Sequence, residues 1–96
     1  MRLRYRRQAE RDIDNIHSHI EMDNPRAAAE VVARIRYAAE RLAIFPYMGH
    51  EGLSVGTYEW VVAGLPYIIV YEVDEVADEV AIIGVLHGAQ YREDER

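Results

Sequence analysis

The chain has 96 residues and a formal net charge of −6, and half of its residues are hydrophobic. That hydrophobic content is sufficient for one core and argues against disorder, so we expect a single domain over residues 1–96. The absence of cysteine excludes disulfides, thiolate metal sites and a cysteine nucleophile. The longest apolar run, from Leu65 to Tyr71, is too short to span a bilayer, and the N-terminus lacks the apolar segment of a secretory signal. We therefore expect a cytoplasmic protein with no membrane partner.

The charge is distributed unevenly along the chain. Residues 1–41 contain nine arginines and seven acids, whereas residues 42–96 contain two arginines and ten acids. An acidic protein is repelled by bulk nucleic acid, so we do not expect the chain to bind DNA directly by itself. Binding to RNA or DNA would need a local basic patch. The dense candidate for such a patch consists of Arg2, Arg4, Arg6, Arg7 and Arg11.

The N-terminal half predicts a strand followed by two helices. Residues 2–6 alternate arginine with an apolar residue, the period of a short strand. Apolar residues then recur at helical spacing from Gln8 to Met22. Asn24 is a favourable N-cap and Pro25 a favourable first helical residue, so a second helix should run from Pro25 to about Ile44. Such a short linker predicts an antiparallel helical hairpin.

The C-terminal half predicts three strands. A glycine-rich loop leads to Gly56, and a half-buried strand follows it up to Val62. The segment Tyr67 to Val73 is almost entirely apolar, which predicts a central strand with side chains covering both faces of the sheet. The last strand should span Val80 to His87, and residues 88–96 read as a frayed tail. The predicted class is α+β, with the order β-α-α-β-β-β and the helical hairpin packed on one face of a small, mostly antiparallel sheet.

No standard catalytic or cofactor motif is present, so we expect neither a cofactor nor a metal. His50 lies in the glycine-rich loop, where it is either a functional residue or part of a plain surface loop. His87 ends the last strand and is suited to proton transfer, but the residue pattern alone favours a half-buried structural histidine. Tyr58 and Trp60 share one strand face, where aromatic rings either stack on bases or fill a core.

Several segments, taken in their order and spacing, resemble the RelE/ParE family of toxins from bacterial type II toxin–antitoxin modules. The resemblance runs from about Leu3 to Tyr91 and is carried by Asn24-Pro25, Phe45-Pro46 with Gly49, Gly56-Thr57, Pro66-Tyr67-Ile68-Ile69-Val70-Tyr71 and Val85-Leu86-His87. It implies a small antitoxin partner whose C-terminal segment wraps the toxin. RelE-like members cut mRNA in the ribosomal A site, whereas ParE-like members inhibit DNA gyrase and are not known to need a catalytic residue.

The chain departs from the family pattern at three positions. His50, Tyr58 and Gly84 stand where the family commonly has arginine. The loss of positive charge favours a ParE-like gyrase inhibitor of the plasmid-stabilisation subgroup. The first alternative is a RelE-like endoribonuclease, for which the resemblance would make His87, Tyr91 and Arg92 the catalytic residues. The second alternative is a non-toxic member that acts only through its partner.

Two binding surfaces follow from this interpretation. The N-terminal arginines Arg2, Arg4, Arg6, Arg7 and Arg11 offer bidentate donors for carboxylates of an antitoxin. Contacts with the target, which is DNA gyrase or the ribosome, are expected at His50, Tyr58 and Trp60.

Overall fold

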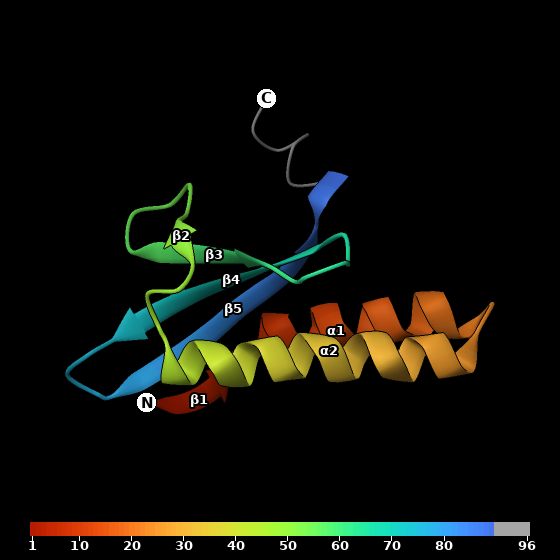
Figure 1. The fold of residues 1–96 in the computed structure, drawn as a ribbon, viewed down its shortest axis with the longest axis horizontal. Coiled ribbons are helices and arrows are strands. Elements are labelled where there is room, and N and C mark those ends of the chain that lie inside the picture. Colours follow the sequence, from red (N-terminus) through yellow and green to blue (C-terminus); the bar gives the residue numbers. More distant parts are fainter. Residues whose placement is uncertain (90–96) are drawn as a thin grey trace.

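The computed structural model describes residues 1–89, which form two helices and a five-stranded mixed sheet (Figure 1). The strand order is β1-β5-β4-β3-β2, with β1 parallel to β5 and the other neighbours antiparallel. The predicted class and element order are confirmed, with one additional short strand. The elements are β1 (Arg2–Tyr5), α1 (Arg7–Glu21), α2 (Pro25–Ile44), β2 (His50–Glu51), β3 (Thr57–Val61), β4 (Tyr67–Asp74) and β5 (Glu79–His87).

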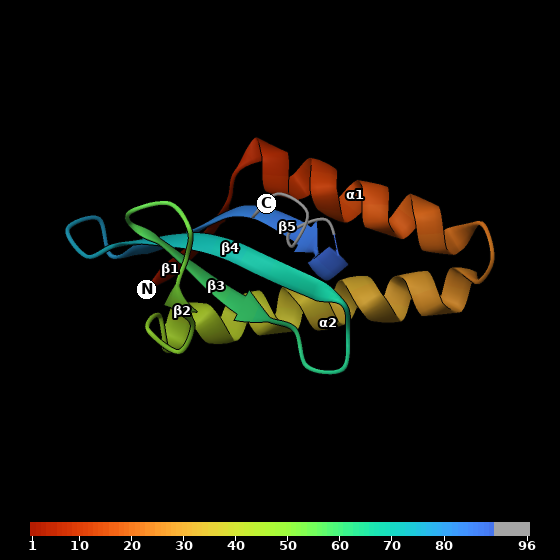
Figure 2. The same ribbon diagram turned by 90° about the horizontal axis from the view of Figure 1, so that it is seen from above.

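The two helices form the expected antiparallel hairpin (Figure 2) and cover one face of the sheet (Figure 1). The side chain of Asn24 accepts a hydrogen bond from the backbone N–H of Ala27 at 3.1 Å, which is the predicted N-cap of α2. Pro25 occupies the first helical position, where its missing N–H costs nothing. No helix in the described part of the chain has the length and hydropathy that crossing a membrane requires.

Strand β4 lies in the middle of the sheet, as predicted, but its two faces are not equally covered. Tyr67, Ile69 and Tyr71 are buried in the core against the helices. Ile68 and Val70, on the opposite face, are only half-buried. The helices cover only one of these faces, because both pack on the same side of the sheet (Figure 1).

Helix α1 also completes the edge of β5 where β1 ends. Pairing with β1 stops at Ile82, and the backbone N–H of Val85 donates instead to Asp12 Oδ2 at 2.9 Å. The interior Gly84 gives this carboxylate room, because a Cβ at that position would lie 3.1 Å from Asp12 Oδ2. A side chain of α1 thus satisfies a strand edge that would otherwise be open.

The two-residue strand β2 was not predicted, since its segment was expected to be a flexible loop. His50 pairs with Glu59 and Glu51 pairs with Tyr58, so β2 extends the sheet beyond β3. The turn that follows is closed by a hydrogen bond from Gly52 N to Thr57 O at 2.8 Å. Pairing with β3 determines the conformation of this loop, and no local sequence pattern predicts that pairing.

Candidate functional site

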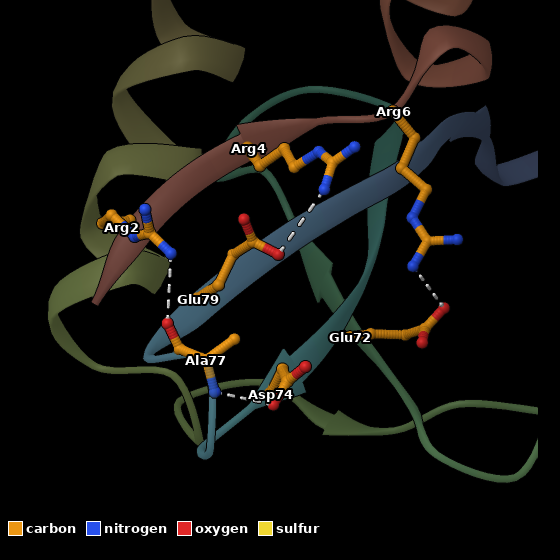
Figure 3. A network of polar contacts seen from close by, with 7 residues as sticks. All are labelled: Arg2, Arg4, Arg6, Glu72, Asp74, Ala77 and Glu79. Atoms are coloured by element: carbon orange, nitrogen blue, oxygen red, sulfur yellow. Dashed lines mark hydrogen bonds and ion pairs between the residues drawn. The ribbon is translucent and has the colours of Figure 1, made fainter.

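Arg2 and Arg4 of β1, and Arg6 directly after it, project from the sheet face that the helices leave open (Figure 3). Their alternation along the strand is as predicted, with Leu3 and Tyr5 turned toward the core. Each of the three guanidinium groups contacts an acceptor of the same chain. The contacts join Arg2 Nη2 to the carbonyl oxygen of Ala77 at 3.3 Å, Arg4 Nη1 to Glu79 Oε2 at 4.0 Å, and Arg6 Nη2 to Glu72 Oε1 at 3.6 Å.

These contacts are exposed and individually weak. The side chains of Arg4 and Arg6 are 69% and 54% exposed, and ion pairs of this kind contribute about 0–1 kcal/mol each. Arg7 is exposed at the start of α1, and Arg11 Nη2 donates to Gln8 Oε1 at 3.3 Å. Arg2, Arg4 and Arg6 therefore share one face of the sheet, and Arg4 and Arg6 share their charge with acids of the β4–β5 hairpin.

A cluster of three tyrosines fixes the chain between α2 and β2. The hydroxyl of the fully buried Tyr71 donates to the carbonyl oxygen of Pro46 at 2.7 Å and accepts from Gly49 N at 3.1 Å. Burial raises the pKa of Tyr71. The ring of Tyr58 lies between Tyr71 and Tyr47, at centroid distances of 5.7 and 5.6 Å. Tyr58 is thus half-buried packing rather than an open stacking platform.

The loop after Gly49 folds over a buried carboxylate. Glu59 is 6% exposed, although it alternates along the strand with Tyr58 and Trp60, which share the other face. Its Oε2 accepts from Leu53 N at 3.3 Å, and its Oε1 lies 3.3 Å from His50 Nε2. The side chain of His50 is 68% exposed. The structure therefore places His50 at the surface and above an acid.

Trp60 shares its strand face with Tyr58, as predicted, and lines a groove between α2 and the edge of β3. The groove has a volume of about 320 Å³ and opens at Arg41 and Met48 into a shallow apolar cleft of about 600 Å³. We refer to both together as the α2 groove. Its lining consists of Arg34, Tyr37, Ala38, Arg41, Ile44, Phe45, Pro46, Tyr47, Met48, Trp60, Val62 and Ala63.

His87 lies at the other end of the sheet. Its ring packs edge-on against Tyr67 at 5.6 Å, and its Nδ1 accepts a hydrogen bond from Ala89 N at 3.1 Å. In the neutral ring, Nε2 then carries the proton. Tyr91 and Arg92, the expected companions of His87, lie outside the described residues.

The two candidate histidines do not share a site. Through Glu59, the strand register aligns His50 with Val70 of β4, whereas His87 lies opposite Tyr67 of the same strand. The two histidines are therefore offset by three residues, or about 10 Å, along the strand direction. Across the sheet, perpendicular to the strands, three strand spacings or about 14 Å separate β2 from β5. His50 contacts Glu59 on the open face, whereas His87 packs on Tyr67, which is buried toward the helices.

Sequence reasoning missed the buried Glu59 and the anchoring hydroxyl of Tyr71, and it did not locate the α2 groove. The first two depend on contacts with a loop whose path the strand pattern does not reveal. The groove left a signal, because Tyr37, Arg41 and Ile44 form a second stripe on α2 at helical spacing.

Solved structures of known proteins share this fold. The chromosomal ParDE toxin–antitoxin system from P. aeruginosa gives a TM-score of 0.81 at 21% identity, covering 91% of this chain and 95% of that chain. The isolated E. coli RelE toxin gives 0.68 at 15% identity, with coverage of 97% and 93%. The RelBE2 toxin–antitoxin complex from Mycobacterium tuberculosis gives 0.62 at 24% identity, with coverage of 90% and 95%. Identities this low show a common fold only.

Sequence comparison is more specific. A protein of Sinorhizobium fredii (strain NBRC 101917 / NGR234) named "Putative toxin Y4kP" is 43% identical over 89 residues, which cover 93% of this chain and 90% of that protein. The family described as "ParE toxin of type II toxin-antitoxin system, parDE" matches residues 3–91. The chain therefore belongs to the ParE family of toxins from type II toxin–antitoxin systems.

Proposed function

We propose that this toxin inhibits growth by binding DNA gyrase in the cytoplasm, and that a small cognate antitoxin neutralises it within a plasmid-stabilising module. The mechanism is protein–protein contact, without covalent chemistry. The proposal rests on the neighbours of His50, Tyr58 and Gly84, the three positions where the family commonly has arginine.

None of these three positions presents an unshared positive charge that could stabilise the anion formed during phosphodiester cleavage. His50 lies against the carboxylate of Glu59, and Gly84 lies against that of Asp12. Tyr58 is packed between two tyrosine rings. Cleavage of RNA through the 2′-hydroxyl needs an acid, a base and donors for the developing anion. Acidic neighbours raise the energy of such an anion, so the arrangement favours binding over cleavage.

The separation of the histidines supports the same interpretation. General acid–base catalysis needs both groups within hydrogen-bond reach of one substrate, about 3 Å. His50 and His87 are on opposite faces of the sheet, more than about 15 Å apart by strand register. A pair made of these two residues cannot act on one phosphodiester.

The contacts that we assign follow the exposed features of the chain. Target contacts are placed at His50 and Trp60, with Tyr58 supporting the loop between them. The N-terminal arginines are assigned to carboxylates of the antitoxin, because exchanging one exposed ion pair for another costs little. That set comprises Arg2, Arg4, Arg6, Arg7 and Arg11.

Two assays on the purified toxin test the target. One measures DNA supercoiling by gyrase, and the other measures cleavage of mRNA programmed on ribosomes. We expect inhibition of supercoiling, no cleavage of free RNA, and full activity of His87→Ala in the gyrase assay.

One outcome would replace this proposal by a RelE-like endoribonuclease. It is mRNA cleavage that disappears in His87→Ala while gyrase is unaffected. That mechanism would use His87, whose Nε2 proton is free to be donated in the neutral ring, together with Tyr91 and Arg92. Absence of toxicity in both assays, with antitoxin binding retained, would instead indicate a non-toxic partner-binding member.

A further inference from the structure

The loop between β2 and β3 exposes its apolar side chains and buries a carboxylate. Leu53 is 63% exposed, and Val55 is fully exposed. The carboxylate of Glu59, from the strand that follows, is covered by the loop. Folding normally buries apolar groups and leaves carboxylates in water, because the reverse arrangement costs free energy. The two apolar side chains therefore add little to the stability of the chain, and they are free to contact a partner.

Hydrogen bonds within the loop close its backbone without help from these side chains. The backbone N–H and the hydroxyl of Thr57 both donate to the carbonyl oxygen of Ser54, at 3.1 and 2.7 Å. The N–H of Gly52 donates to the carbonyl oxygen of Thr57 at 2.8 Å. Gly56 has a φ of 85°, which glycine adopts without strain. A loop closed in this way loses less conformational entropy when a partner binds it.

Glu59 fastens the loop to the sheet. Its Oε2 accepts a hydrogen bond from the backbone N–H of Leu53 at 3.3 Å, and its Oε1 lies 3.3 Å from His50 Nε2. The backbone of Glu59 is paired with Val70 of the central strand β4, so the carboxylate is held by the rigid part of the fold. One buried side chain thus contacts both ends of the segment 50–53 and fixes where its apolar tip points.

The charge near the loop indicates what kind of partner fits it. The sequence has no arginine or lysine between Arg41 and Arg92, and Glu51 is exposed directly before the loop. A surface with basic residues around an apolar pocket complements this pattern. An enzyme that holds DNA has such basic surface for the phosphates. A second copy of the chain fits less well, because a two-fold contact at the tip would place Glu51 near its own counterpart.

We propose that the tip of this loop, from Leu53 to Val55, inserts into an apolar pocket with a basic rim on DNA gyrase, and that Glu59 is the residue that positions it. The inference rests on the proposed function, which names gyrase as the target. It adds an apolar anchor to the target contacts at His50 and Trp60. The loop projects from the sheet on the side away from the helices, where a large partner can reach it (Figure 1).

The test measures binding of the whole toxin to purified gyrase holoenzyme, together with inhibition of supercoiling. Leu53→Asp and Val55→Asp should each weaken binding at least about tenfold, because a carboxylate would enter an apolar pocket. Glu51→Lys should weaken it at least about threefold by placing a cation near the basic rim. Val76→Asp is the matched control, since Val76 is a fully exposed valine at the tip of the β4–β5 hairpin. Its affinity should stay within about twofold of the wild type, and circular dichroism checks that each variant folds.

Two substitutions of Glu59 test its positioning role. Glu59→Gln keeps an acceptor for the N–H of Leu53 and should bind gyrase within about threefold of the wild type. Glu59→Ala removes that acceptor, so it should bind at least about tenfold more weakly and exchange the Leu53 amide hydrogen faster. Adding Val55→Asp to Glu59→Ala should then weaken binding by less than about threefold more, because the tip is no longer held in place. If Glu59 only stabilised the fold, Val55→Asp would keep its full effect.

The outcomes separate this inference from the proposed function. A wild-type toxin that neither binds nor inhibits gyrase overturns both. Wild-type inhibition that persists in Leu53→Asp and Val55→Asp, or that is lost equally in Val76→Asp, overturns the loop assignment and leaves gyrase as the target. Wild-type affinity in Glu59→Ala, or a full effect of Val55→Asp in its background, overturns the positioning role. A toxin dimer that disappears in Val55→Asp would assign the tip to a second copy and overturn the gyrase contact.

Discussion

Replacing Tyr71 by phenylalanine tests whether one hydroxyl holds the segment between α2 and β2. The ring remains in the core, so the change removes only the phenol oxygen. That oxygen donates to the carbonyl of Pro46 and accepts from the backbone N–H of Gly49. Both partners lose their hydrogen bond in the variant, in a partly buried setting.

The expected loss is about 2–3 kcal/mol. Each intramolecular hydrogen bond contributes about 0.5–1.5 kcal/mol, and a buried group left without a partner costs about 1–3 kcal/mol. We place the estimate below the sum of the upper values, because the loop can move and admit water. For a domain of this size, that loss lowers the melting temperature by about 10–20 °C.

Urea unfolding followed by Trp60 fluorescence measures the change, and Tyr37→Phe is the matched control. Tyr37 is largely exposed, so removing its hydroxyl should change the free energy of unfolding by less than about 0.5 kcal/mol. Burial raises the pKa of Tyr71, so its stabilising contribution is complete below pH about 10 and fades as the pH rises above it. The gap between wild type and Tyr71→Phe should therefore narrow in alkali. A loss no larger than that of Tyr37→Phe at neutral pH would refute the anchoring role.

Three further changes have defined outcomes. Gly49→Ala should destabilise the chain by at least about 2 kcal/mol in the same urea assay, because the added Cβ would lie 2.5 Å from the Tyr71 hydroxyl; Gly88→Ala, whose nearest contact would be 3.6 Å, should be near neutral. Asn24→Ala should cost about 1 kcal/mol by removing the N-cap of α2, and an unchanged melting temperature would contradict this. The hydrogen bond to Glu75 raises the pKa of Tyr47 to about 12, so Glu75→Gln should return that titration toward about 10, read from the tyrosinate absorbance.

Local sequence signals were sufficient for the helical hairpin and for the long strands. Asn24 and Pro25 each prefer the backbone position that they occupy, so no distant contact was needed to locate the start of α2. The β1 arginines alternate outward because the period of a strand is two. The apolar run at Tyr67 predicted a central strand, but how fully each face is covered depends on where the helices pack.

The site was harder to predict because its contacts are distant in sequence. Glu59 alternates with Tyr58 and Trp60 along β3, and it is buried because a loop six to nine residues earlier in the chain folds over it. His50 and His87 looked equally available, and only the register of four strands shows that they lie far apart. Charge counts did predict that basic character is concentrated near the N-terminus. They could not show that Arg4 and Arg6 contact acids of the β4–β5 hairpin.

The surface that we propose for target contact adjoins the α2 groove. The segment from Phe45 to Met48 lines the α2 groove and leads directly into His50, which we assign to the target. Trp60 belongs to both surfaces. A partner lying in the α2 groove would therefore cover part of the surface that we propose for target contact. The hydroxyl of Tyr71 positions this segment, because it donates to the carbonyl oxygen of Pro46 and accepts from the backbone N–H of Gly49.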